Sequence, residues 1–153
     1  MPVWFSISPA VFLGALMALT GVAALIERIS RHRRTRALRS LAAQWRMTYS
    51  PHDLLRIAPR IASVFPVPGA ADVYVVDLIY GTKGDEYRYV FTAEYTTGVI
   101  RGKRRQVRAA TFCEPRGRDG DQSPQPVSLA PGDLPLLEQY RRLAPLPLPV
   151  QTE

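Results

Sequence analysis

Few residues of this 153-residue chain have the types and spacing that catalysis or metal binding requires. The chain contains two histidines, His32 and His52, and a single cysteine, Cys113. His52 precedes Asp53 directly, and Asp77 is the one acid inside a long apolar run. A lone cysteine excludes an internal disulfide and any multi-cysteine zinc site. We expect no metal site and no cofactor.

Each of these residues has an ordinary structural role that the sequence favours over a catalytic one. Asp53 is placed to cap a helix, and Cys113 lies among small apolar residues that suit a buried, inert thiol. Asp77 is expected to pair across a sheet with Arg88 or Arg108.

The chain shows no GxSxG elbow, HExxH helix, P-loop or dinucleotide fingerprint. We therefore predict no catalytic residues and no enzymatic activity. An undetected hydrolase-type enzyme that uses Asp77, His52 or Cys113 is the open alternative.

Most of the net charge of +7 comes from one short segment. Six arginines less Glu27 supply +5 of it, directly after an apolar stretch. Basic clusters at the cytoplasmic end of a membrane span attract anionic headgroups and also determine topology. The predicted anionic-lipid contacts are Arg28, Arg31, Arg33, Arg34, Arg36 and Arg39.

A second basic run lies at a predicted hairpin beside an aromatic strand. It is a candidate ligand patch for anionic lipid or nucleic acid. The glycines of RNA-binding strands are absent, so nucleic acid is disfavoured, and a solvated hairpin tip is the simpler interpretation. The patch comprises Arg101, Lys103, Arg104, Arg105 and Arg108.

The apolar stretch from Ile7 to Ile26 has the length of a transmembrane helix, because 20 helical residues rise about 30 Å. A cleaved signal peptide is disfavoured, since no basic residue precedes the stretch and no small-residue cleavage pattern follows it. All arginines follow the span, which predicts an outside N-terminus and a cytoplasmic C-terminal domain. Small residues at Ala10, Gly14 and Ala18 leave helix dimerisation open.

Apolar spacing predicts that the helix continues to about residues 48–50, with Leu38, Leu41, Ala42 and Trp45 on one face. Ser50 resembles the N-cap of a new helix, with Pro51 and Asp53 in its first turn. Short helical pieces are expected up to Phe65.

Three segments have strand patterns: 72–80, 86–96 and 104–114. The second alternates cleanly, which predicts a strand buried on one face only. The expected fold class is α+β, with the transmembrane helix followed by a helix packed on an antiparallel meander of about three strands. The expected organisation is an anchor at 1–27, a basic juxtamembrane helix at 28–49, a small α+β domain at 50–114, a flexible loop at 115–132, and a short helix with a Pro-rich tail at 133–153.

The order of these features resembles a bacterial family of small single-pass membrane-anchored α+β proteins that carry a domain of unknown function. The resemblance rests on an LAxxxxxxYxPxD motif over Leu41–Asp53, a YxYTT-like segment over Ala93–Thr97 and the basic hairpin Lys103–Arg105. It covers about residues 7–114, and Glu94 stands where an aromatic residue is frequent. The resemblance implies architecture alone. The excess of 18 Arg over 2 Lys fits a GC-rich bacterial genome.

Together these patterns predict a single-pass protein of the bacterial inner (plasma) membrane with a cytoplasmic, non-catalytic binding or interaction domain. Its expected partners are the lipid bilayer, anionic lipids, and either a membrane protein or a second copy of the chain.

Overall fold

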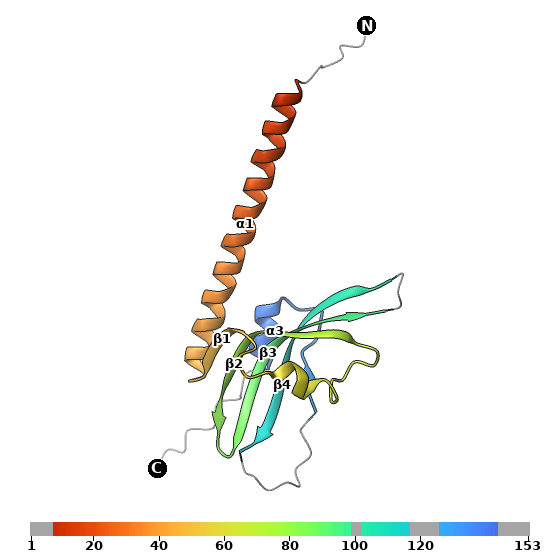
Figure 1. The fold of residues 1–153 in the computed structure, drawn as a ribbon. Coiled ribbons are helices and arrows are strands. Elements are labelled where there is room, and N and C mark those ends of the chain that lie inside the picture. Colours follow the sequence, from red (N-terminus) through yellow and green to blue (C-terminus); the bar gives the residue numbers. More distant parts are fainter. Residues whose placement is uncertain (1–7, 99–101, 117–125, 144–153) are drawn as a thin grey trace. The chain divides into compact units, whose positions relative to one another are not determined.

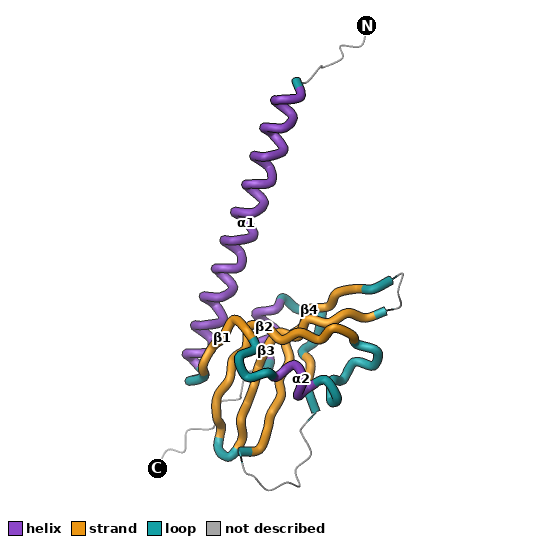
Figure 2. The backbone as a smooth tube through the Cα atoms, viewed as in Figure 1, coloured by secondary structure: helices purple, strands orange, loops and turns teal. Residues whose placement is uncertain are grey.

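A computed structural model describes residues 8–98, 102–116 and 126–143 (Figures 1 and 2). The chain forms two compact units, Met1–Arg36 and Ala37–Glu153. Helix α1, Pro9–Gln44, begins in the first unit and ends in the second. Each unit is considered by itself below.

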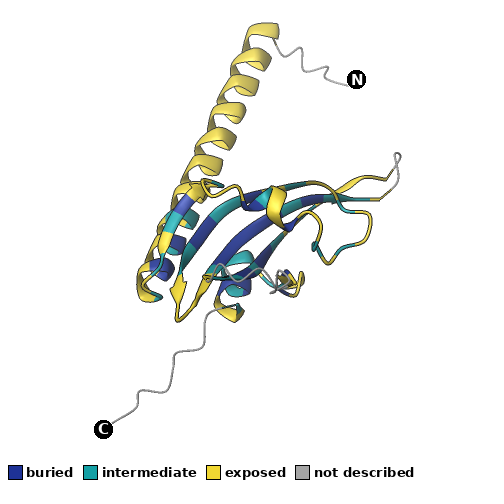
Figure 3. Cartoon of the chain, turned by 60° about the horizontal axis from the view of Figure 1, so that its bottom comes forward, coloured by how far each residue is buried: buried dark blue, intermediate teal, exposed yellow. Residues whose placement is uncertain are grey.

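The first unit is a helix whose residues 8–33 are all exposed. Figure 3 shows this part of α1 as one exposed stretch. Pro9 stands in the first turn, where its missing N–H costs no intrahelical bond. The helix is long and apolar enough to cross a membrane, which confirms the predicted long apolar helix.

The last turns of α1 belong to the second unit and pack into its core through Leu38, Leu41 and Ala42. This confirms the apolar face that the spacing predicts. The predicted end near residues 48–50 is wrong, because α1 stops at Gln44. Arg46 takes a left-handed φ of 55°, and the N–H of Met47 donates to the Ala42 oxygen at 2.9 Å, the hydrogen bond of a Schellman helix end.

The second unit is built on a five-stranded antiparallel sheet with strand order β1-β2-β3-β4-β5. The α+β class is confirmed, and the expected number of about three strands is wrong. The three predicted strands are the long central ones, and a short strand is added at each edge. The bounds are β1 Thr48–His52, β2 Ala71–Lys83, β3 Glu86–Thr97, β4 Arg104–Pro115 and β5 Ser128–Leu129.

Strand β1 replaces the helix start that Ser50 and Pro51 predict. Ser50 lies opposite Leu78 and His52 opposite Val76, so the segment extends the edge of β2. An edge strand tolerates proline because the side of the strand that lacks the N–H can face outward. The helix starts further along the chain than predicted, as α2, Ile57–Ile61. Asp53 accepts a hydrogen bond from the N–H group of Ile57, the first residue of α2.

Strand β3 lies at the centre of the sheet and is buried on both faces, contrary to the prediction of one solvent face. Phe91 and Ala93 belong to one core cluster and Val90 to the other, each with no exposed surface. Thr92 is equally buried. The alternating pattern of β3 correctly predicts which side chains share a face of the sheet. It does not predict that both faces are covered.

Two separate layers cover the sheet. One face is covered by α2 and the segment after it, where the Phe65 ring packs edge-on to Tyr95 at 5.1 Å. The other is covered by the end of α1 and by α3, Leu136–Arg142, whose Tyr140 is fully buried. Figure 3 shows long stretches of the central strands as buried.

The segment predicted as a flexible loop at 115–132 contributes to the core where it is described. Ser128 and Leu129 pair with Thr111 and Ala110, and Val127 and Ala130 are buried. The predicted helix after it is confirmed as α3. The Pro-rich tail lies outside the described residues, as do residues 117–125.

Candidate functional site

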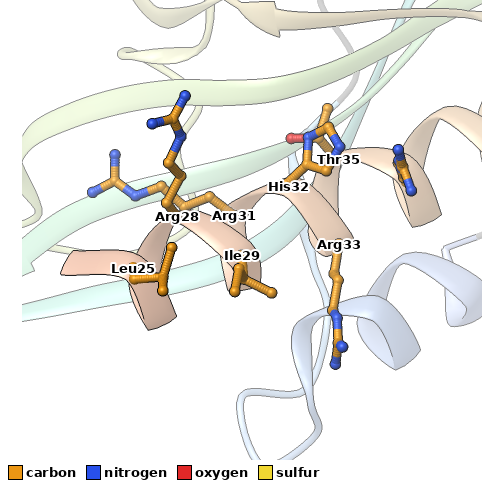
Figure 4. A pocket seen from close by; sticks show the side chains of 8 residues that line it. Leu25, Arg28, Ile29, Arg31, His32, Arg33 and Thr35 are labelled. Carbon is orange, nitrogen blue, oxygen red and sulfur yellow. The ribbon is translucent and has the colours of Figure 1, made fainter. Parts of the chain in front are cut away.

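The part of α1 that follows its apolar stretch is the most strongly charged surface of the first unit. Arg28, Arg31, Arg33 and Arg36 are exposed, whereas Arg34 is half-buried. The exposed arginines and the apolar Leu25 and Ile29 line a hollow of about 760 Å³. Figure 4 shows these lining side chains along this part of α1. The arrangement places guanidinium groups next to aliphatic side chains, which matches the polar and apolar parts of a phospholipid.

Arg31 and Arg39 of the predicted lipid-contact set have partners within their own unit. Arg31 forms an exposed ion pair with Glu27 one turn earlier, a geometry that contributes little in water. Arg39 lies in the second unit, with its guanidinium 5.7 Å from the centre of the Tyr49 ring. The lipid-contact candidates of the first unit are therefore those up to Arg36.

The second basic run does not form one patch. Lys103 and Arg104 are exposed, whereas Arg105 pairs with Glu94 on the neighbouring strand. The half-buried Arg108 donates two hydrogen bonds to the Ala130 oxygen, at 3.0 and 2.6 Å. Its role is to hold the chain after β5 against β4. Arg101 lies outside the described residues.

A half-buried polar cluster surrounds a bulge in β2 that sequence reasoning missed. Asp77 takes a left-handed φ of 51°. Two residues of β2, Asp77 and Leu78, lie opposite a single residue of β3, Phe91. The Tyr49 hydroxyl donates to Asp77 Oδ1 at 2.7 Å. The expected partners lie elsewhere, with Arg88 opposite Gly81 and Arg108 bound to Ala130. The left-handed backbone conformation of Asp77 has no recognisable pattern in the sequence, so the cluster could not be predicted from it.

The residues of the alternative enzyme hypothesis are not assembled into one group. His52 is exposed on β1 opposite Val76, next to Asp77. Cys113 is buried on β4 in register with Arg88, which itself faces Gly81 on β2. Strands lie about 4.8 Å apart, so Cys113 is two strands from Asp77 and several residues along the sheet. The predicted burial of Cys113 is confirmed.

Asp53 accepts hydrogen bonds at the start of α2, although the N-cap position itself is Arg56, whose side chain makes no capping bond. Its carboxylate accepts hydrogen bonds from the N–H groups of Ile57 at 2.7 Å and Ala58 at 2.9 Å. Both oxygens are therefore used by the first turn of α2.

Within residues 8–98, 102–116 and 126–143, no three His, Cys, Asp or Glu side chains lie close enough together to hold a metal ion. Comparisons with protein-family models, curated proteins and solved structures found no match to the chain. Its function is therefore argued from its own geometry.

Proposed function

We propose that the chain is a single-pass protein of the bacterial inner membrane that holds a non-catalytic interaction domain at the cytoplasmic surface. The observation that carries this proposal is the uninterrupted exposure of the apolar residues of α1. Exposed leucine and valine side chains over several helical turns are unfavourable in water and favourable in a bilayer. None of the most apolar window of α1 is buried.

The orientation follows from the position of the arginines. Arg28 is the first basic residue after the apolar stretch, and five further arginines follow within twelve residues. Cytoplasmic segments next to a span carry such an excess. The N-terminus therefore faces outward and the α+β domain faces the cytoplasm.

The exposed arginines next to the span bind anionic lipid headgroups. Each cation near an anionic surface contributes on the order of 1 kcal/mol. The hollow beside Leu25 and Ile29 supports this assignment, because a phospholipid presents phosphate and hydrocarbon to the same stretch of helix.

The domain itself serves binding and not catalysis in this proposal. Asp53 is occupied as a helix cap, Cys113 is buried, and the Asp77 carboxylate accepts a hydrogen bond from Tyr49. These roles are structural, and they support the interaction function over the hydrolase alternative.

Cysteine labelling from each side of the membrane tests the topology. In a Cys113→Ser background, Val3→Cys and Gly120→Cys variants of the full chain are treated with an impermeant maleimide in intact spheroplasts and after lysis. We expect labelling of position 3 in intact cells and of position 120 only after lysis. Labelling of position 120 from outside would reject the orientation, and extraction of the chain by alkaline carbonate would reject the anchor.

A further inference from the structure

The outer end of the β3–β4 pair carries cations that the fold does not use. Lys103 and Arg104 are exposed, and within the described part of the chain neither side chain has a hydrogen bond or ion pair. Arg105 pairs with Glu94 but leaves 68% of its side chain exposed. Two carboxylates lie beside these three cations, because the exposed Asp72 lines the same hollow as Glu94 and Arg105. This end, here called the hairpin end (residues 103–105), therefore keeps a charge of +1.

The hairpin end has a defined backbone. Strands β3 and β4 stay in register over twelve pairs, from Glu86–Pro115 to Thr97–Arg104. Gly98 has a φ of 106°, and a Cβ placed on it would lie 2.7 Å from the Gly102 oxygen. The two glycines hold the strands close together where the cations begin.

Apolar side chains lie beside these cations on the sheet face that α3 covers only in part. Tyr74 and Val107 flank Glu94 on either side in one cross-strand row, with 63% and 40% of their surfaces exposed. Arg105 occupies the next row toward the hairpin end, opposite Thr96. A basic end with an adjoining apolar face, including a tyrosine, is typical of surfaces that bind the bilayer interface.

The sheet does not present the surface that single-stranded nucleic acid requires. Base stacking needs exposed aromatic rings on the sheet. Tyr89, Phe91 and Tyr95 of β3 are at most 5% exposed. The exposed rings, Tyr74 and Tyr87, lie in distant cross-strand rows, at positions 94 and 87 of β3, so they form no continuous stacking surface. The charges therefore suit a membrane surface better than a nucleic acid.

We propose that the hairpin end binds the anionic surface of the bilayer in which the chain is anchored, as a second lipid contact borne by the domain. This inference rests on the proposed function, because the anchor confines the domain to the membrane and so raises its effective concentration there. A few cations recruit a free protein only weakly. They are sufficient to dock a tethered domain, and docking fixes which surfaces of the domain face the cytoplasm.

A lipid-proximity measurement on the full chain tests the docking. A nitrobenzoxadiazole label is attached to Thr97→Cys, opposite Arg104, in a Cys113→Ser background. A matched label is placed at Asp85→Cys, in the turn at the other end of β3. The proteins are reconstituted in nanodiscs of phosphatidylcholine, with or without phosphatidylglycerol, that contain doxyl-labelled lipid.

We expect the label at position 97 to be quenched in anionic nanodiscs and much less in neutral ones, and the label at position 85 to be insensitive to composition. Lys103→Glu/Arg104→Glu removes the effect, since each lost cation weakens binding about fivefold. Arg141→Glu/Arg142→Glu makes the same change of charge on the exposed end of α3 and leaves it intact. Thermal unfolding of each variant verifies that the domain is folded.

Equal quenching at position 97 in both lipid compositions would overturn the inference while leaving the anchor intact, because the chain would still be in the nanodisc. Failure of the chain to enter nanodiscs would instead reject the proposed function. A response of the label to single-stranded RNA in neutral nanodiscs, without a response to phosphatidylglycerol, would assign the hairpin end to nucleic acid and also overturn it.

Discussion

The hydroxyl of Tyr140 donates a 2.7 Å hydrogen bond to the backbone oxygen of Asp77, a residue 63 positions earlier in the chain. A tyrosine has one hydroxyl proton, so in the 2.9 Å contact between Thr92 and Tyr140 the threonine is the donor. This chain of bonds joins α3 to the bulge of β2 and to the central strand β3. It explains how a seven-residue helix is fixed on the sheet.

Removing the Tyr140 hydroxyl tests this connection. Tyr140→Phe leaves the Thr92 hydroxyl and the Asp77 oxygen without this partner in a buried site. We expect the free energy of unfolding to fall by about 1–3 kcal/mol. Urea unfolding of the full chain in detergent, followed by Trp45 fluorescence in a Trp4→Phe background, measures it.

Tyr74→Phe is the matched control, because Tyr74 is 63% exposed. It should change the unfolding free energy by no more than about 0.5 kcal/mol. Equal effects of the two substitutions would show that the Tyr140 hydroxyl does not contribute to stability.

Periodic apolar patterns were sufficient to predict the buried face of the last turns of α1 and the three long strands, because these segments bury side chains at regular spacing. Strand β1 could not be predicted in the same way. Ser50, Pro51 and Asp53 are typical of a helix start, and only the open edge of β2 makes the segment a strand. The bulge at Asp77 was hidden as well, since its conformation depends on the register between β2 and β3.

In the candidate site, too, some features follow from the local sequence and others depend on tertiary contacts. The arginines after the apolar stretch are clustered within twelve residues, so they could be recognised from composition alone. The sequence could not show which cations of the second basic run have a partner, because their partners are determined by the tertiary structure. Arg105 meets Glu94 across the β3–β4 ladder, and Arg108 meets the Ala130 oxygen, 22 residues further along the chain.

The cap of α2 gives a second stability prediction. Asp53→Ala removes the acceptors of the Ile57 and Ala58 N–H groups, and we expect a loss of about 1–2 kcal/mol in the urea experiment. Asp53→Asn keeps one side-chain oxygen and should lose less. A loss as large for asparagine as for alanine would show that the second oxygen, and not capping in general, is what α2 requires.

The left-handed residue after α1 predicts a stabilising substitution. Arg46 has a φ of 55° at the position of the helix end that favours glycine. Arg46→Gly relieves the steric cost of that conformation, offset in part by a more flexible unfolded chain, for a net gain of about 0.5–1 kcal/mol. Arg46→Ala keeps the conformation and removes the side chain, so it should be close to neutral. A loss of stability in the glycine variant would contradict this explanation.

The hairpin end predicts a difference between two glycines of the same sheet. Both Gly98 and Gly84 have positive φ, of 106° and 60°, but only Gly98 lies against another backbone, that of Gly102. Gly98→Ala therefore has to separate the strands and should lower the unfolding free energy by at least about 2 kcal/mol. Gly84→Ala has open space around its Cβ, and its cost should stay near 1 kcal/mol, the cost of the left-handed backbone alone. Equal losses would mean that backbone conformation, and not the contact with Gly102, determines the cost at position 98. Hydrogen exchange of the β3–β4 amides separates these explanations further, because only strand separation increases exchange next to the hairpin end while leaving the β2–β3 turn unchanged.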